Sequence, residues 1–125
     1  MSETGGFDTI TLEVLWQRLV SAVDEASAAL IRSAFSTIVR ESHDFACVIV
    51  DSRGELLAQA QNSIPAFIGT LPRTVQWLMT HFKPSELVPG DVLISNDPWF
   101  GTGHLPDVNL VKPLFHRGAL VGYAA

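Results

Sequence analysis

The sequence contains a single cysteine, Cys47, among 125 residues. One cysteine cannot form an internal disulfide, which is typical of a protein from a reducing compartment. The first residues, MSETGGFD, are acidic and polar, without the basic start and apolar core of a signal peptide. No apolar run approaches the roughly 20 residues that span a bilayer. These absences predict a cytoplasmic protein that does not bind or cross a membrane.

Basic residues are also few. The chain has 8 Lys and Arg against 13 Asp and Glu, for a formal net charge of -5. They are scattered along the sequence, whereas a nucleic-acid-binding protein carries a basic patch, so we expect no nucleic-acid partner. A basic amphipathic face for a membrane surface is missing as well. Apolar residues make up 47% of the chain, which is enough to build one folded domain.

The N-terminal third predicts one long helix. Residues 1–8 are expected to be a flexible leader, and Asp8 or Thr9 is a suitable N-cap residue. From Thr9 to about Ser33, apolar residues recur at steps of three and four, which places them on one helix face. A helix of this length needs a large surface to cover that face, which consists of Leu12, Leu15, Leu19, Val23, Ala26 and Leu30.

The remainder predicts hairpins and a second, shorter helix. One hairpin turns at residues 51–54, where Gly54 suits a positive φ, and another turns at residues 116–118 between strands near 108–115 and 119–125. Thr70 is expected to cap the second helix, which stops near Lys83 because Pro84 follows. A short strand covers residues 92–95, and Pro113 indicates an edge or a bulge. This order predicts an α+β fold with a mostly antiparallel sheet.

The chain ends with ALVGYAA, inside an apolar pattern. A domain rarely stops within a strand that nothing ties down. We therefore expect residues 9–125 to be the N-terminal portion of a larger domain.

The stretch SNDPWFGTGHLPDVNL, residues 95–110, holds the main candidate site. His104 and Asp107 are three residues apart, and Pro106 between them stiffens the segment. An imidazole beside a carboxylate is a common start of a site for zinc, manganese or iron. Asp97 is a candidate third ligand, or an acceptor that orients His104. The alternative is that residues 96–98 form an Asx-type turn and His104 packs without a ligand.

Other polar residues have two interpretations each. Cys47 is a candidate nucleophile, but its apolar neighbours favour a buried small hydrophobic residue. Glu41 and Asp44 are a candidate acid and base, or Asp44 closes a turn. His81 and His116 are expected to be solvated surface histidines. The glycines of residues 101–103 lack the lysine and the length of a phosphate-binding P-loop.

Four blocks in this order resemble the N-terminal part of the hydantoinase B/5-oxoprolinase family. They are TLEVLWQRLVSAVDEASAALIRSAFS, RESHDFACVIVDSRGELLAQA, IPAFIGTLPRTV and PGDVLISNDPWFGTGHLPDVNLVKPLF, between Thr9 and Ala125. The last is similar to the family's N-D-P-x-x-G-G-T-H-L-P-D. The family includes N-methylhydantoinase B subunits, 5-oxoprolinases and acetone or acetophenone carboxylase subunits. Two departures are Phe67, where the family often has the histidine of P-x-H-L-G, and F-G-T-G-H in the diagnostic block.

The resemblance implies a B-type subunit in a hetero-oligomer with a hydantoinase A-type subunit, which binds ATP. The pair would hydrolyse the C–N bond of a cyclic amide such as hydantoin or 5-oxoproline. The carboxylase branch implies that His104 and Asp107 hold a divalent metal, with a further ligand from an H-x-D block beyond residue 125. Asp97 would orient the site, and Asp44 is a catalytic candidate at its rim. The alternatives are a subunit of an ATP-dependent ketone carboxylase, and a truncated, inactive fragment or assembly module.

Overall fold

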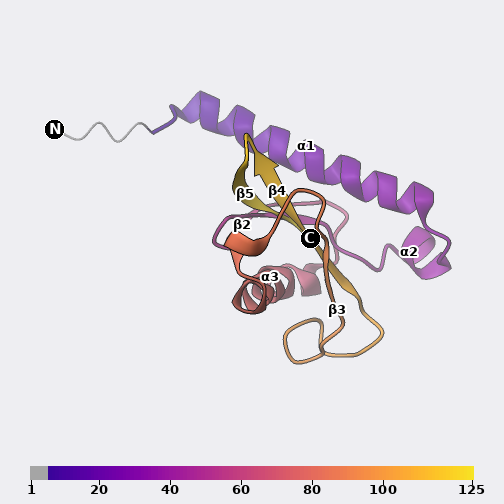
Figure 1. Ribbon diagram of the computed structural model, residues 1–125. Coiled ribbons are helices and arrows are strands. Elements are labelled where there is room, and N and C mark those ends of the chain that lie inside the picture. Colours follow the sequence, from indigo (N-terminus) through magenta and orange to yellow (C-terminus); the bar gives the residue numbers. More distant parts are fainter. Residues whose placement is uncertain (1–5) are drawn as a thin grey trace.

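The computed structural model describes residues 6–125 and has an α+β fold in which helices lie on both sides of one sheet (Figure 1). Residues 1–5 of the expected leader lie outside this range. Across residues 6–125, no helix combines the length and apolar character that crossing a bilayer requires. Two short 3-10 helices accompany the main elements, which are α1 (Thr9–Ser33), α2 (Thr37–Ser42), α3 (Thr70–His81), β1 (Val48–Asp51), β2 (Leu56–Gln59), β3 (Leu93–Ser95), β4 (Asn109–His116) and β5 (Ala119–Ala124).

The sheet has the strand order β2-β1-β5-β4-β3, and every neighbouring pair is antiparallel. Both predicted hairpins are present, as β1–β2 and β4–β5. The second turn has positive φ at Arg117 and Gly118, the backbone that a two-residue hairpin turn requires. The predicted edge or bulge at Pro113 is also confirmed, because β3 pairs with β4 only as far as Val111 and the β4–β5 register shifts after Leu114.

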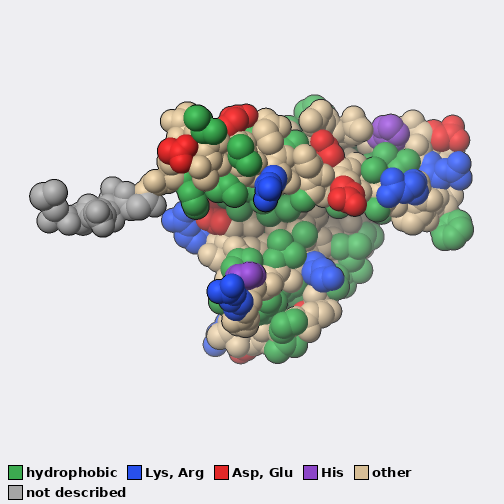
Figure 2. Space-filling model, turned by 90° about the horizontal axis from the view of Figure 1, so that it is seen from above, with side chains coloured by type: hydrophobic (Ala, Val, Ile, Leu, Met, Phe, Trp, Pro, Cys, Tyr) green, Lys and Arg blue, Asp and Glu red, His purple; other side chains and the backbone are tan. Residues whose placement is uncertain are grey.

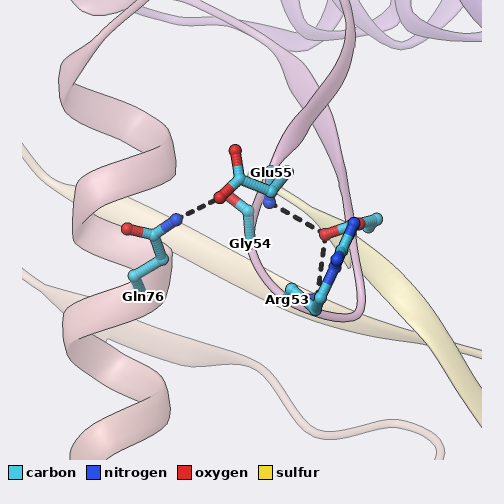
Figure 3. A network of polar contacts seen from close by, with 5 residues as sticks. Arg53, Gly54, Glu55 and Gln76 are labelled. Carbon is cyan, nitrogen blue, oxygen red and sulfur yellow. Dashed lines mark hydrogen bonds and ion pairs between the residues drawn. The ribbon is translucent and has the colours of Figure 1, made fainter.

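The turn between β1 and β2 docks against α3 (Figure 3). Asp51 Oδ1 accepts hydrogen bonds from the backbone N–H groups of Arg53 and Glu55, at 2.8 and 2.9 Å. Gln76 Nε2 of α3 donates to the Gly54 carbonyl oxygen at 3.3 Å. A Cβ atom on Gly54 would lie 2.6 Å from Gln76 Cγ, and its φ is 82°. Glycine is therefore required at this turn both for its backbone and for the approach of α3.

Alternating residues of β1 face two different apolar clusters. Val48 and Val50 pack against α3 in the main core, together with Val75 and Tyr123, all with at most 2% exposure. Val23 of α1 packs with Ala58 and Ala60, and Cys47 and Ile49 contact this second cluster. The sheet is thus covered by α3 on one face and by α1 on the other, as Figure 1 shows.

The buried face of α1 differs from the predicted one. Val23 and Ser27 are buried, whereas Ala26 and Leu30, expected on the covered face, are exposed. Leu12 and Leu15 are exposed too, because the N-terminal half of α1 extends beyond the strands (Figure 1). The bounds of α1 match the prediction, and Asp8 is its N-cap: Asp8 Oδ1 accepts from the N–H groups of Ile10 and Thr11, each at 3.0 Å.

Three local features depart from the sequence-based expectation. Helix α2 was not predicted; Ser36 caps it and His43 ends it in the left-handed conformation, with φ of 51°. Gly69, rather than Thr70, occupies the N-cap position of α3. Helix α3 ends at His81, two residues before Lys83, because the chain is already extended at Phe82 ahead of Pro84.

Candidate functional site

The candidate site lies on the loop of residues 96–108, which joins β3 to β4. Its base is closed by the antiparallel pair Ser95 and Asn109, whose side chain donates to the Ser95 carbonyl oxygen at 3.4 Å. Asn96 Nδ2 donates to the carbonyl oxygen of Leu105 at 3.2 Å, which ties the two halves of the loop together. The loop therefore connects two paired strands, and its internal hydrogen bonds restrict the conformations that it can adopt.

His104 and Asp107 come together near the end of this loop. His104 Nε2 lies 2.9 Å from Asp107 Oδ2, and their side chains are 57% and 27% exposed. The contact is close but lacks the alignment of a hydrogen bond, so the buried Asp107 Oδ2 has no hydrogen-bond partner. The structure thus brings the two predicted residues side by side, with Asp107 Oδ2 facing the His104 ring nitrogen.

Asp97 makes two local hydrogen bonds at the start of the loop. Its Oδ1 accepts a hydrogen bond from the Trp99 N–H at 2.9 Å, and its own N–H donates to Ser95 Oγ at 3.1 Å. Within residues 6–125, no three His, Cys, Asp or Glu side chains form a group suited to a metal ion. Asp97 therefore forms the Asx-type turn given above as the alternative, and a part for it as a metal ligand or as an acceptor that orients His104 stays a prediction.

A pocket of about 750 Å³ lies between the loop, the end of α1, α2 and the segment of residues 44–47 that precedes β1. His104, Asp107 and Thr102 line it on the loop side, and apolar side chains such as Phe45 and Phe67 line much of the remainder. Thr102 Oγ1 is buried and, like Asp107 Oδ2, has no hydrogen-bond partner. Buried polar atoms without partners are rare in folded proteins, and two of them border this one pocket.

Asp44 and Cys47 line the same pocket but have structural environments. The backbone N–H of Asp44 donates to the Ile38 carbonyl oxygen at 3.3 Å, which closes the end of α2, and the side chain is exposed. The N–H of Cys47 donates to Ser63 Oγ at 3.2 Å. Burial raises the pKa of the Cys47 thiol, which keeps it protonated and weakly nucleophilic. These observations support a packing role for Cys47, while the catalytic role of Asp44 stays a prediction.

The remaining candidates lie outside the pocket. His81 is exposed at the end of α3, where its Nδ1 lies 3.1 Å from the Trp77 carbonyl oxygen, and His116 is exposed beside the β4–β5 turn. The expectation of surface histidines is thus confirmed. Glu41 is exposed in α2 and does not line the pocket with Asp44.

Sequence reasoning missed two residues of this region. The sequence gives Thr102 only as part of a glycine-rich turn, although a polar side chain between two glycines and two residues before His104 is a usable signal. Thr74 of α3 hydrogen-bonds the loop from a distant part of the chain, at the Phe100 carbonyl oxygen. No local sequence pattern predicts that contact, because it depends on how α3 packs against the sheet.

Comparison with known proteins extends this picture. The family model described as hydantoinase B/oxoprolinase matches residues 8–125. The chain belongs to this family. It is 33% identical over 118 residues to 5-oxoprolinase 1 of Arabidopsis thaliana, and 33% identical over 119 residues to the putative B-type subunit of a D-/L-hydantoinase from a Pseudomonas species. Each match covers 94% of this chain, and they cover 9% and 20% of those proteins.

Two solved structures share the fold of this family member. The ATP-dependent caprolactamase from Pseudomonas jessenii aligns with a TM-score of 0.79 and 28% identity, over 94% of this chain and 20% of that one. A nucleotide-free acetone carboxylase aligns with a TM-score of 0.84 and 22% identity, over 94% and 16% of the two chains. The second likeness shows the fold alone. The chain thus spans a fifth or less of the length of these four proteins.

Proposed function

We propose that this chain contributes the His104–Asp107 site to the B-type component of an ATP-dependent hydrolase of cyclic amides, acting in the cytoplasm. The observation that carries the proposal is the pair itself: two ligand-type side chains 2.9 Å apart, with the buried Asp107 Oδ2 unsatisfied, at a largely apolar pocket. Family membership and the relatives named as 5-oxoprolinase, hydantoinase and ATP-dependent caprolactamase support the reaction class.

The donor set fits a divalent metal such as zinc, manganese or iron. Imidazole nitrogen and carboxylate oxygen are common ligands of these ions. With metal–ligand bonds of about 2.0–2.2 Å, neighbouring ligands of one ion lie roughly 3 Å apart, close to the distance observed here. A metal held by His104 and Asp107 would supply Lewis acidity, which polarises an amide carbonyl and acidifies water. The further ligand would come from outside the described residues.

The residues of this chain have separate parts in the proposed reaction. His104 and Asp107 hold the metal, and the buried hydroxyl of Thr102 offers a hydrogen bond to a polar atom of the substrate. The apolar wall around Phe67 excludes water from the carbon skeleton of the ring. Asp44 at the rim is the candidate for proton transfer. The A-type partner binds ATP and uses it to activate the amide, which is too stable to open readily without activation.

Metal content tests the proposal directly. The protein is purified with its A-type partner as wild type, as His104→Ala/Asp107→Ala, and as the control His116→Ala, whose histidine lies outside the pocket. We expect the double variant to lose the metal and at least about 100-fold in ATP-dependent ring opening, because removing groups that only orient metal ligands already costs about 10–100-fold. The control should match the wild type. Equal metal content in all three proteins would refute the metal assignment.

Substrate panels separate the remaining alternatives. Hydantoin, 5-oxoproline and caprolactam test ring hydrolysis, and acetone or acetophenone with bicarbonate tests carboxylation. If only a ketone is turned over, the proposed reaction becomes carboxylation instead of hydrolysis. Association with the A-type partner without metal and without turnover would make the chain an assembly module.

A further inference from the structure

Helix α3 reaches the candidate loop through Thr74. This side chain is fully buried, and its Oγ1 lies 2.6 Å from the Phe100 carbonyl oxygen and 3.0 Å from the Thr70 carbonyl oxygen. A hydroxyl has one proton, so it donates to one acceptor at a time, and the shorter distance favours Phe100. A threonine inside a helix usually bonds back to the preceding turn. Here the hydroxyl instead joins α3 to the loop that carries His104 and Asp107.

A second contact holds the same loop residue. Trp77 lies three residues after Thr74, on the same face of α3, and its ring stacks on Phe100 with centroids 4.7 Å apart and planes 6° apart. Phe100 is 44% exposed, so the stack gives the loop a fixed position without burying it in the core. The main chain and the side chain of Phe100 are thus each held by α3.

The next residue of the loop, Gly101, fits closely against β4. A Cβ atom on Gly101 would lie 2.8 Å from the Asp97 carbonyl oxygen and 2.9 Å from Asn109 Nδ2. Asn109 is 5% exposed, so the chain at Gly101 fits closely against a buried side chain. Residues 100 and 101 are therefore fixed between α3 and β4, and His104 follows three residues later.

We propose that Thr74 is a positioning residue, which with Trp77 clamps Phe100 to α3 so that the loop presents His104 and Asp107 together to the pocket. A loop that is ordered before binding loses less conformational entropy when it binds a ligand. The proposal rests on the function proposed above only for the identity of the ligand. The clamp itself is a property of the described contacts.

The test compares variants that differ by one hydroxyl. Thr74→Val removes the donor, Thr74→Ser keeps it, and Thr80→Val is a matched control, because Thr80 Oγ1 of the same helix donates to the Trp77 carbonyl oxygen at 2.7 Å and does not touch the loop. In each protein, purified with its partner and freed of metal, Zn²⁺ binding is measured by calorimetry and amide hydrogen exchange is measured over residues 96–108.

For Thr74→Val we expect Zn²⁺ binding about 10–100-fold weaker, the range found when groups that orient metal ligands are removed, and faster exchange in the loop. Thr74→Ser and Thr80→Val should match the wild type in both measurements. If Thr74→Val also matches it, the clamp does not position the site and the proposal is wrong. If Thr74→Val loosens the loop while no protein binds Zn²⁺, the clamp stands and the metal assignment fails.

A further variant covers the case in which Thr74→Val does not fold. Phe100→Leu removes the ring stack but keeps the carbonyl acceptor, and the partly exposed position tolerates the change. We expect faster exchange over residues 97–104 at an unchanged melting temperature. Unchanged exchange in Phe100→Leu would overturn the proposal.

Discussion

Five buried side-chain polar atoms among residues 6–125 have no hydrogen-bond partner, and two of them, Asp107 Oδ2 and Thr102 Oγ1, border the pocket. Asp107 Oδ2 faces His104 Nε2 at 2.9 Å, whereas Thr102 Oγ1 forms no hydrogen bond, and a buried group without one costs about 1–3 kcal/mol. Thr74, by contrast, is fully buried and its hydroxyl is used. A ligand that hydrogen-bonds Thr102 Oγ1 would offset this cost, which makes Thr102 the residue to test.

Thr102 offers the sharpest test at this scale. Thr102→Val has nearly the same shape and breaks no hydrogen bond of the fold, so stability should stay equal or rise by up to about 1 kcal/mol. If the hydroxyl contacts the substrate, turnover in the full complex should nevertheless fall at least tenfold. Urea denaturation and steady-state kinetics measure the two effects, with Thr102→Ser as the control that retains the hydroxyl. A destabilised variant with full activity would assign the hydroxyl to the fold.

Among the elements, α1 depends on how its first turn is capped. Asp8 Oδ2 accepts a hydrogen bond from Thr11 Oγ1 at 2.6 Å, and Oδ1 accepts from two backbone N–H groups. The hydrogen bond from the Thr11 side chain, followed by the one from its N–H, holds the pKa of Asp8 below its ordinary value of 3.8. These bonds favour the charged carboxylate in the folded state.

The sign of the resulting pH dependence follows from that shift. Because the folded-state pKa is lowered, the cap contributes its full stabilisation above the ordinary value of Asp and loses it as the pH falls through the lowered pKa. We expect the amide resonances of residues 10–12 to shift toward unfolded positions on acidification below about pH 4. Asp8→Asn, which keeps an acceptor without the charge, should remove this transition. Asp8→Ala should fray the turn at every pH, and an identical titration in all three proteins would contradict the role of Asp8.

On the scale of the molecule, packing is uneven. The core lies between α3 and the sheet, whereas the N-terminal half of α1 extends past the strands with Leu12 and Trp16 more than half exposed. Figure 2 looks down on the α1 side and shows hydrophobic side chains exposed among charged ones. The free energy of folding therefore comes mainly from the α3 layer and from the C-terminal half of α1.

Two leucines of opposite burial test this division. Leu78→Ala, on the buried face of α3 with 2% exposure, should lower the free energy of unfolding by about 2–5 kcal/mol. Leu12→Ala, on the projecting half of α1, should change it by no more than about 0.5 kcal/mol. Both are read from urea denaturation of the same preparation. Equal losses would mean that the first half of α1 is covered in solution.

Local patterns in the sequence determined the bounds of α1, both hairpin turns, the antiparallel α+β class and the family. Periodicity, caps and turn residues act over a few positions, so they can be read without knowing the neighbours. The same patterns did not locate the buried side of α1, the face that Cys47 takes, or the contact of α3 with the loop of residues 96–108. Only the tertiary structure decided those, because each depends on segments that are distant in the chain. Helix α1 packs across β2, Gly122 of β5 lies against the Val50 carbonyl of β1, and Thr74 of α3 binds the Phe100 carbonyl oxygen. Packing geometry sets such contacts, and no stretch of the chain contains both partners.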